Sequence, residues 1–273
     1  MTLKDLYNWY SELETVTVKK NCLETLRVLR QYINRLGNPD VKNVTLQFIV
    51  QDRLNRLKNA KPGTTNIEVS SLREMLNNAV LHGKTTKNPI RDLKLLPTKN
   101  VREVHLKQTD VVKLMKHAPD WLVHLILIAA HMPMRREEII GLTWQEIDFN
   151  AGENGSLRLS GSRTKNAKGR AIPLHPKVRE LLQRLTSRFK NGFVFEDQKM
   201  IASKFDYEFR KCRESAGLPN IRYHDLRHLC ISEMFKAGIP QYTIMKLAGH
   251  SSDAMFRRYM YLDDEELFNL KWA

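Results

Sequence analysis

The sequence predicts a mainly α protein with a small β-sheet, an α+β fold that is divided into two domains. Apolar residues recur at helical spacing through most of the chain, and two short strand-like runs lie at 156–160 and 170–174. A segment of turn-forming and charged residues separates the two parts. We therefore expect a helical domain at 1–96, a linker at 97–103 and a second domain at 104–273.

The first domain is predicted as a bundle of about four helices. Its apolar stripes are interrupted at Gly37-Asn38-Pro39 and at Lys61-Pro62-Gly63, and the segment 83–89 ends the bundle. Lysine and arginine side chains between the apolar positions are expected to face solvent. The expected helices cover approximately residues 3–10, 23–33, 44–57 and 65–81.

The second domain begins with a helix whose capped start is predicted at Thr109 and Asp110. The segment 121–132 is apolar on nearly all sides, which predicts a buried helix. Between the strand-like runs, the segment 161–169 predicts a hairpin with a basic tip. Further helices are expected at 176–189, 203–216, 224–234 and 241–247, and the tail 263–273 predicts a helix that docks either on a neighbouring protomer or on its own domain.

The charge favours a polyanionic partner, above all nucleic acid. The 273 residues carry a formal net charge of +15, with a pI of about 9.8. Residues 1–100 contain 17 Lys and Arg against 9 Asp and Glu, which excludes a single basic tail at the other end. The alternative is an ordinary protein with an uneven charge balance.

Features of an exported or membrane protein are lacking in the sequence. The three cysteines, Cys22, Cys212 and Cys230, are odd in number and widely separated, which is typical of reduced thiols in a cytosol. The first residues include an acid and form no apolar run, and the longest apolar run, 125–130, is too short to span a membrane. We expect a cytoplasmic, nucleoid-associated protein with no membrane partner.

One short stretch, His224-Asp225-Leu226-Arg227-His228, opens the central helix of the second domain. His224 and Arg227 are three residues apart and share one helix face, where an imidazole and a guanidinium together suit a phosphate. Such a pair also arises by chance. His224 and His228 resemble the zinc motif of metallopeptidases as well, but Asp225 is shorter than the glutamate of that motif and no third ligand is evident, so we predict no metal site.

Two arginines follow the buried helix at once. We expect Arg135 to point into a pocket and to be held by Glu138, although a surface turn with local salt bridges is the simpler interpretation. The order of Arg135, a basic hairpin with Lys165, the His224–Arg227 pair, Gly249-His250 and finally Tyr259 resembles the tyrosine recombinase family, which includes phage integrases and Xer-type recombinases.

The resemblance implies a helical, SAM-like core-DNA-binding bundle followed by a tyrosine recombinase catalytic domain. It implies that Arg135 and Arg227 clamp the scissile phosphate and that His224 and His250 complete its hydrogen bonding. The remaining implied roles are Lys165 as the acid that protonates the leaving 5′ oxygen, Tyr259 as the nucleophile, and Glu138 as the support of the first arginine.

The chain departs from the family pattern in one place, and three roles have competitors. The family usually has glycine two residues before the first arginine, where this chain has Pro133, so the turn before Arg135 is expected to differ in shape. The competitors are Arg136 for Arg135, Lys168 for Lys165 and Tyr261 for Tyr259.

The function implied by the resemblance is site-specific DNA recombination through a covalent 3′-phosphotyrosine, without metal, ATP or another cofactor. The implied partners are a double-stranded DNA core site, three further copies in a homotetramer on two sites, and directionality or host DNA-bending factors. Because the bundle begins near residue 3, no further arm-binding domain is expected. The alternatives are a non-catalytic, decayed relative, a type IB topoisomerase and a zinc metallopeptidase. Expected DNA contacts come from Arg163, Lys168, Arg170, Arg222, Lys84 and Lys87.

Overall fold

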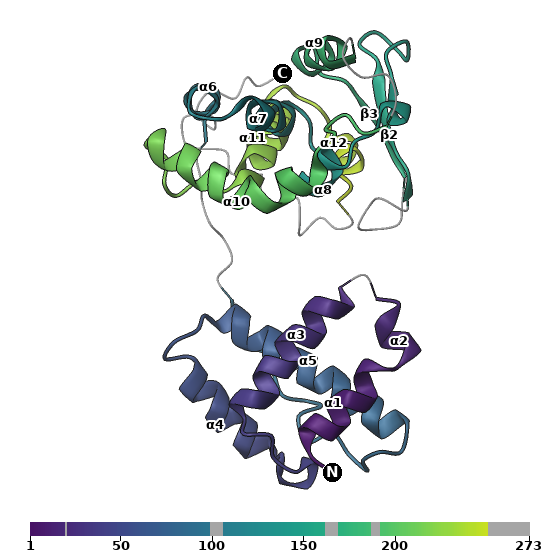
Figure 1. Ribbon diagram of the computed structural model, residues 1–273, viewed down its shortest axis with the longest axis vertical. Helices are drawn as coiled ribbons and strands as arrows, with labels where there is room; N and C mark the ends of the chain where they lie inside the picture. Colours follow the sequence, from purple (N-terminus) through teal and green to yellow (C-terminus); the bar gives the residue numbers. More distant parts are fainter. Residues whose placement is uncertain (20, 99–105, 162–168, 187–191, 251–273) are drawn as a thin grey trace, which may run out of the picture. The chain divides into compact units, whose positions relative to one another are not determined.

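The computed structural model describes residues 1–19, 21–98, 106–161, 169–186 and 192–250 (Figure 1). The chain divides into two compact units, Met1–Asn100 and Val101–Ala273, each with a hydrophobic core of its own. Helices dominate both units, and one small sheet lies in the second, which confirms the predicted mainly α fold with a small sheet.

The N-terminal unit is built around three helices that pack on one another, α1 (Leu3–Ser11), α3 (Cys22–Arg35) and α5 (Pro62–Leu81). Its other elements are α2 (Glu14–Thr17), the 3-10 turn η1 (Val41–Asn43) and α4 (Leu46–Arg56). The four predicted helices are present, and α2 is an addition that is too short to show a periodic pattern. Helix α5 begins earlier than predicted because Pro62 occupies its first turn, where a missing backbone N–H costs nothing.

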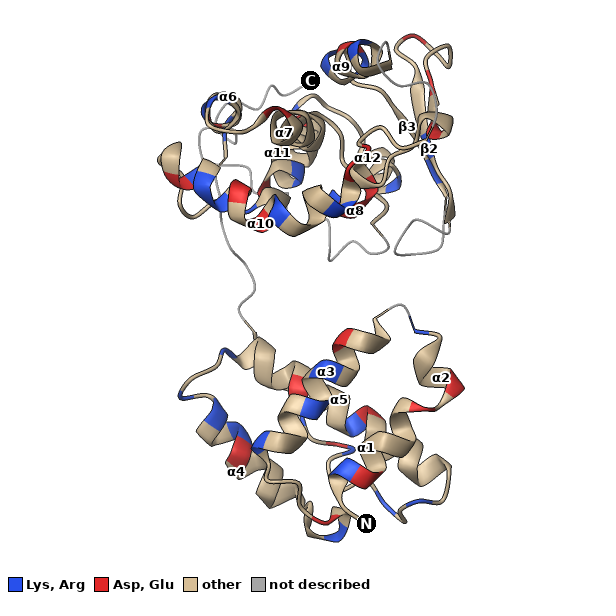
Figure 2. Ribbon diagram, in the orientation of Figure 1, with Lys and Arg blue, Asp and Glu red and all other residues tan. Residues whose placement is uncertain are grey.

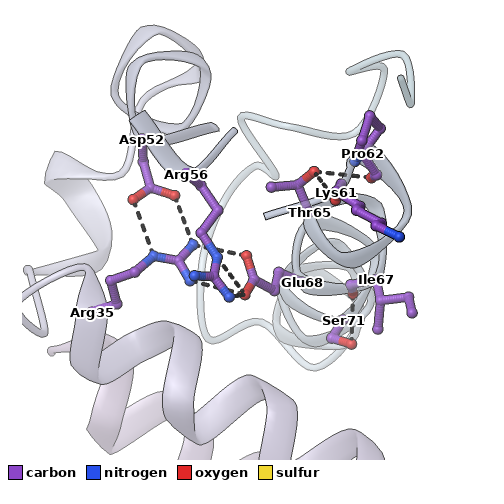
Figure 3. A network of polar contacts seen from close by, with 9 residues as sticks. All are labelled: Arg35, Asp52, Arg56, Lys61, Pro62, Thr65, Ile67, Glu68 and Ser71. Carbon is purple, nitrogen blue, oxygen red and sulfur yellow. Dashed lines mark hydrogen bonds and ion pairs between the residues drawn. The ribbon is translucent and has the colours of Figure 1, made fainter. Parts of the chain in front are cut away.

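Charged side chains from three helices form one network of contacts in this unit (Figure 3). Arg35 of α3 donates to both oxygens of Glu68 of α5, at 2.9 and 2.8 Å, and its Nη2 lies 3.1 Å from Asp52 of α4. Arg56 of α4 lies 3.1 Å from Glu68, which is only 7% exposed. A buried carboxylate therefore holds two guanidiniums and ties α4 to the α3–α5 pair.

Glu68→Gln is expected to lower the local stability of the N-terminal unit by about 1–3 kcal/mol, because two guanidiniums lose their charged partner. Hydrogen exchange of α3 and α5 peptides in the full chain measures this change. Glu24→Gln is the matched control, since Glu24 pairs with Arg27 on an exposed face, and such pairs contribute little. Equal exchange rates in the two variants would show that the network is dispensable.

The second unit is organised around a buried helix, α7 (Asp120–His131), which packs against α6 (Gln108–Lys116), α9 (Pro176–Thr186) and α11 (Tyr223–Lys236). The sequence predicted this buried helix. The other helical elements of the second unit are α8 (Arg136–Ile140), the 3-10 turn η2 (Trp144–Glu146), α10 (Gln198–Ser215) and α12 (Gln241–Ala248). Helix α6 begins earlier than predicted, because Lys107 and not Thr109 is its N-cap and the Asp110 carboxylate accepts the Lys107 backbone N–H.

The sheet has the strand order β1 (Ile147–Asp148), β2 (Ser156–Leu159) and β3 (Arg170–Pro173), and both pairs are antiparallel. The two predicted strands are β2 and β3, with Leu157 opposite Ile172 and Leu159 opposite Arg170. Because side chains alternate between the faces of a strand, Arg170 points to the same side as the buried Ile172. The basic tip predicted between these strands, residues 162–168, lies outside the described residues.

Positive charge is present in both units, as the blue segments of Figure 2 show. The three cysteines are free thiols, two of them buried. Among the helices that the structure describes, none is both long enough and apolar enough to cross a membrane.

Candidate active site

The C-terminal end of α12 is the point on which the site is built. Gly249 has a φ of +67° and closes the helix, and the His250 and Gly249 N–H groups donate back to the carbonyls of residues 245 and 246. The carbonyls of residues 247–249, hereafter the α12 carbonyls, lie at the C-terminal end of the helix, where its dipole is negative. They therefore attract cationic donors.

Three arginines from three different elements bind the three α12 carbonyls. Arg135 is the N-cap residue of α8, Arg170 is the first residue of β3, and Arg227 lies in the second turn of α11. Each guanidinium thus satisfies one backbone acceptor and is held at a fixed place. The bonds run from Arg170 Nε to Leu247 at 2.8 Å, from Arg227 Nη2 to Ala248 at 2.7 Å, and from Arg135 Nη2 to Gly249 at 3.0 Å.

Glu138 binds two of these arginines, Arg135 and Arg170. Its carboxylate accepts from Arg135 Nη1 at 3.1 Å, from the Arg135 backbone N–H at 2.8 Å, and from Arg170 at 3.1 and 2.7 Å. Burial opposes the ionisation of Glu138, but the hydrogen bonds from Arg170 and from the Arg135 backbone outweigh it and lower the pKa of the carboxyl. The side chain is 3% exposed and remains an anion at neutral pH.

Arg227 is the most deeply buried of the three arginines, at 2% exposure. Besides its bond to α12, its Nη1 donates to the Pro133 carbonyl at 2.9 Å, and its Nη2 lies 3.0 Å from Nε2 of His250. Pro133 is the centre of a tight turn in which the Met134 N–H donates to the Met132 carbonyl at 2.7 Å, a turn that suits the fixed φ of proline. The proline therefore forms a turn whose carbonyl holds Arg227.

The two histidines of the site are neutral at pH 7. Loss of solvent around the ring, and then the charges of Arg227 and Arg135, lowers the pKa of His250 to about 4. His224 lies in the first turn of α11, with its ring edge-on to His228 at 4.8 Å between centroids. Although part of His224 is exposed, desolvation of the rest, and then His228 and Arg227, lowers its pKa to about 4. A bound phosphate would raise both pKa values and favour hydrogen bonds from these rings.

The structure brings together Arg135, Glu138, Arg227 and His250, and His224 stands one turn before Arg227 on α11. Arg136, the competitor of Arg135, pairs instead with Glu137 and Asp206 and lies over Phe205. The other predicted site residues lie outside the described residues: Lys165 and Tyr259, their competitors Lys168 and Tyr261, and the predicted DNA contact Arg163.

The predicted DNA contacts that are described fall in three different settings. Lys84 and Lys87 line a hollow of about 770 Å³ in the N-terminal unit. Arg222 lines another of about 560 Å³, next to His224 in the second unit. Arg170 is 5% exposed and bound to Glu138, which favours a role inside the protein over the DNA contact predicted from the sequence.

The sequence did not predict the contacts of Arg170. It also did not predict that Arg170, Arg135 and Arg227 each bind one of the three α12 carbonyls. One available signal was the two-residue period of β3, which puts Arg170 on the face of Ile172 and therefore toward the core. Backbone carbonyls carry no sequence signal of their own, so the meeting point at α12 emerges only from the fold.

This arrangement suits a tetrahedral anion. Two guanidiniums and two imidazoles offer fixed donors, which stabilise negative charge on phosphate oxygens without having to reorganise. Among the described residues, no group of three or more His, Cys, Asp or Glu side chains could hold a metal ion. The fixed donors of these four side chains support phosphate binding and charge stabilisation.

Gly249→Ala is expected to weaken phosphate binding and to lower the free energy of unfolding. A Cβ there would lie 3.1 Å from Arg170 Nη1 and 3.5 Å from Arg135 Nη1, on a backbone that L residues rarely adopt. The matched control is Gly238→Ala, where φ is +77° and a Cβ would have no heavy atom within 4 Å. Both variants should lose about 1–2 kcal/mol in urea unfolding. Only Gly249→Ala should also weaken the binding of inorganic phosphate, and equal phosphate affinity of the two variants would contradict the tight approach.

Comparison with known families gives two matches that together cover most of the chain. Residues 105–266 match the phage integrase family, and residues 1–97 match the phage integrase N-terminal domain. A Haemophilus influenzae protein named putative integrase/recombinase is 27% identical over 97% of this chain and 74% of its own length. The shufflon-specific DNA recombinase of Escherichia coli is 27% identical over 96% of this chain and 69% of its own length.

Solved structures show the same fold. A lambda integrase dimer bound to a COC′ core site has a TM-score of 0.78 at 20% identity, covering 100% of this chain and 98% of that one. A lambda integrase tetramer bound to a Holliday junction has a TM-score of 0.76 at 19% identity, covering 100% of this chain and 79% of that one. The Tn1549 transposon integrase in complex with transposon right end DNA has a TM-score of 0.74 at 21% identity, covering 98% of each chain.

Proposed function

The chain belongs to the phage integrase family and is a site-specific DNA recombinase, and we propose that it cuts and rejoins strands through a covalent bond between Tyr259 and a DNA 3′-phosphate. The observation that carries the proposal is the pair of fixed guanidiniums, Arg135 and Arg227, beside the neutral imidazole of His250. The resemblance adds the tyrosine, which stands nine residues after His250 in the sequence.

The proposed reaction is a transesterification at phosphorus. Arg135 and Arg227 hold the non-bridging oxygens, and His224 and His250 donate further hydrogen bonds. The Tyr259 hydroxyl releases its proton to solvent and its oxygen forms a bond to phosphorus. The bond to the 5′ oxygen breaks, and Lys165 gives that oxygen a proton. A 5′ hydroxyl from another strand reverses the step. Because the phosphotyrosine conserves the bond energy, rejoining requires neither ATP nor a metal.

A duplex core site is the proposed DNA partner. We assign residues 1–96 as the core-DNA-binding domain, 97–103 as the linker and 104–273 as the catalytic domain, a division that the two family matches support. Lys84, Lys87 and Arg222 are proposed DNA contacts, together with Arg163 and Lys168. Binding should weaken steeply with salt, since phosphate contacts displace counterions.

Four copies on two core sites form the proposed active assembly, and the lambda integrase tetramer on a Holliday junction supports this. The segment 263–273 is proposed to dock on a neighbouring copy, with directionality or DNA-bending factors as further partners. Bacterial and phage relatives support action on DNA in the cytoplasm and nucleoid of a bacterial cell.

Covalent trapping tests the proposed reaction. The full chain is incubated in EDTA with nicked duplexes from a random-sequence pool, in which loss of a short fragment after cleavage prevents rejoining. We expect a protein–DNA adduct that survives denaturation, and mass mapping should place the DNA 3′-phosphate on Tyr259. Sequencing the trapped DNA then identifies a core site for later assays.

An adduct on Tyr261 would keep the reaction but reassign the nucleophile. An adduct that requires a divalent metal would contradict the metal-free mechanism. Salt-sensitive DNA binding without an adduct, on a pool confirmed to contain the bound sequences, would favour the non-catalytic alternative.

A further inference from the structure

Arg170 is a buried charged side chain to which the proposed reaction assigns no step. Its guanidinium makes three hydrogen bonds, two to the Glu138 carboxylate at 3.1 and 2.7 Å and one to the Leu247 carbonyl at 2.8 Å. The exposed fractions of the Arg170 and Glu138 side chains are 5% and 3%. These contacts hold the guanidinium inside the protein, and they connect it to Glu138 and to the end of α12.

One of those groups, the Glu138 carboxylate, also holds Arg135. Glu138 Oε1 accepts from Nη1 of both arginines, and Oε2 accepts from Arg170 Nη2 and from the Arg135 backbone N–H. The carboxylate therefore sets the spacing between the two guanidiniums. Removing Arg170 would take away two of the four hydrogen bonds described here that hold the Glu138 carboxylate, and the position of Arg135 would be less tightly fixed.

The two arginines are joined a second time through α12. Arg170 binds the Leu247 carbonyl and Arg135 binds the Gly249 carbonyl, two residues further along the same helix end. Arg135, Glu138, Arg170 and the end of α12 thus form a closed ring of contacts. Arg227 binds the carbonyl between the other two, so it shares the support that the ring gives to α12.

We propose that Arg170 is a positioning residue for DNA cleavage, which fixes Arg135 against the end of α12 and so holds the two phosphate-binding guanidiniums at their working separation. This inference rests on the proposed function. This position requires a planar group with three donors. Two of its N–H groups bind the two oxygens of the Glu138 carboxylate, and a third binds the Leu247 carbonyl. A lysine at this position supplies the charge but cannot make all three contacts at once.

Single-turnover cleavage of a duplex that carries the core site identified by covalent trapping tests the proposal. Arg170→Gln and Arg170→Lys should both cleave roughly 10- to 100-fold more slowly than the unmodified protein. Their affinity for the same duplex should remain nearly unchanged, because only one of many phosphate contacts is misplaced. Affinity and cleavage are measured on one nicked duplex at one salt concentration.

Arg179→Gln is the matched control for loss of a structural arginine. Arg179 is half-buried on α9 of the same unit and donates to the Phe149 carbonyl at 2.7 Å, and none of its hydrogen bonds described here reaches Glu138 or α12. This variant should lose stability in urea and cleave DNA at the unmodified rate. If Arg170→Gln does not fold, the comparison is made with Arg170→Lys, which retains the charge.

A double-mutant cycle separates positioning from a general loss of stability. If Arg170 acts through Glu138, the double variant Arg170→Gln, Glu138→Gln should cleave no more slowly than the slower of the two single variants. Arg170→Gln combined with His224→Gln should instead show the product of the two single effects. Multiplicative effects in both cycles would overturn the proposal.

A readout independent of DNA cleavage uses inorganic phosphate as the probe. The Nε–H signals of Arg135 and Arg227 are followed by NMR in the full chain during a phosphate titration. In the unmodified protein and in Arg179→Gln, both signals should shift together. In Arg170→Gln, the Arg135 signal should broaden and lose its response to phosphate, whereas that of Arg227 should keep part of it.

The cleavage assay and the phosphate titration together distinguish the proposed reaction from the proposed role of Arg170. If the unmodified protein forms no adduct but its arginine signals behave as expected, the proposed reaction fails, whereas the part of the inference that Arg170 fixes Arg135 for phosphate binding stands. If the protein cleaves DNA and Arg170→Gln retains both the full rate and an unchanged Arg135 signal, the positioning role is overturned and the proposed reaction stands.

Discussion

Tyr259→Phe is expected to abolish the covalent protein–DNA adduct while leaving DNA binding intact. The change removes only the oxygen that would attack phosphorus, and removal of a nucleophile typically lowers the rate by at least roughly 10⁴-fold. A phenol has a pKa near about 10, so its reaction at neutral pH depends on cations such as Arg135 and Arg227 at the phosphate. Adduct yield after denaturation and duplex affinity, measured on one core site, test both parts.

The control lies two residues further along. Tyr261→Phe removes the same oxygen from a neighbouring phenol in the same segment and should retain the adduct. Loss of the adduct in Tyr261→Phe with retention in Tyr259→Phe would assign the reaction to Tyr261. Retention in both variants would remove tyrosine chemistry from the proposal altogether.

Arg227→Lys should have the second largest effect, a loss of roughly 10²–10³ in the cleavage rate. Lysine keeps the charge but presents one ammonium in place of a planar fork, and therefore cannot donate to the Pro133 and Ala248 carbonyls and to a phosphate together. Because Arg227 is 2% exposed, some stability should be lost as well. Single-turnover cleavage and urea unfolding of the same preparation measure the two effects.

Arg179→Lys makes the same chemical change outside the arginine cluster and should affect stability alone. If Arg227→Lys cleaves DNA at a rate that tracks only its loss of folded protein, the arginine is structural. A rate deficit that persists at saturating DNA, under conditions where the variant is fully folded, is the expected result.

The local parts of the site could be predicted from the sequence because their partners lie close along the chain. His224 and Arg227 share a helix face at a spacing of three, and Glu138 reaches Arg135 across one turn. The buried helix α7 was evident because its residues are apolar on nearly all sides of the helix. Elements such as β1 and α8 were missed because two or five residues are too few to show a period.

The non-local parts could not be predicted in the same way. Arg170 meets Glu138 across 32 positions and Leu247 across 77, and its basic neighbours in the sequence suggested a surface hairpin. Pro133 was expected to alter the turn before Arg135, and the structure shows that its carbonyl holds Arg227. In both cases the binding partner belongs to an element that lies much later in the chain, so no local sequence pattern predicts the contact.

The meeting of three arginines at α12 also implies an order of assembly during synthesis. The carbonyls that fix Arg135, Arg170 and Arg227 lie 114, 77 and 21 residues further along the chain. A nascent or prematurely ended chain that stops before α12 carries the phosphate-binding arginines without the backbone that aligns them. Such an incomplete chain lacks the three backbone acceptors that hold these guanidiniums in place, so we expect it to bind inorganic phosphate more weakly than the full chain.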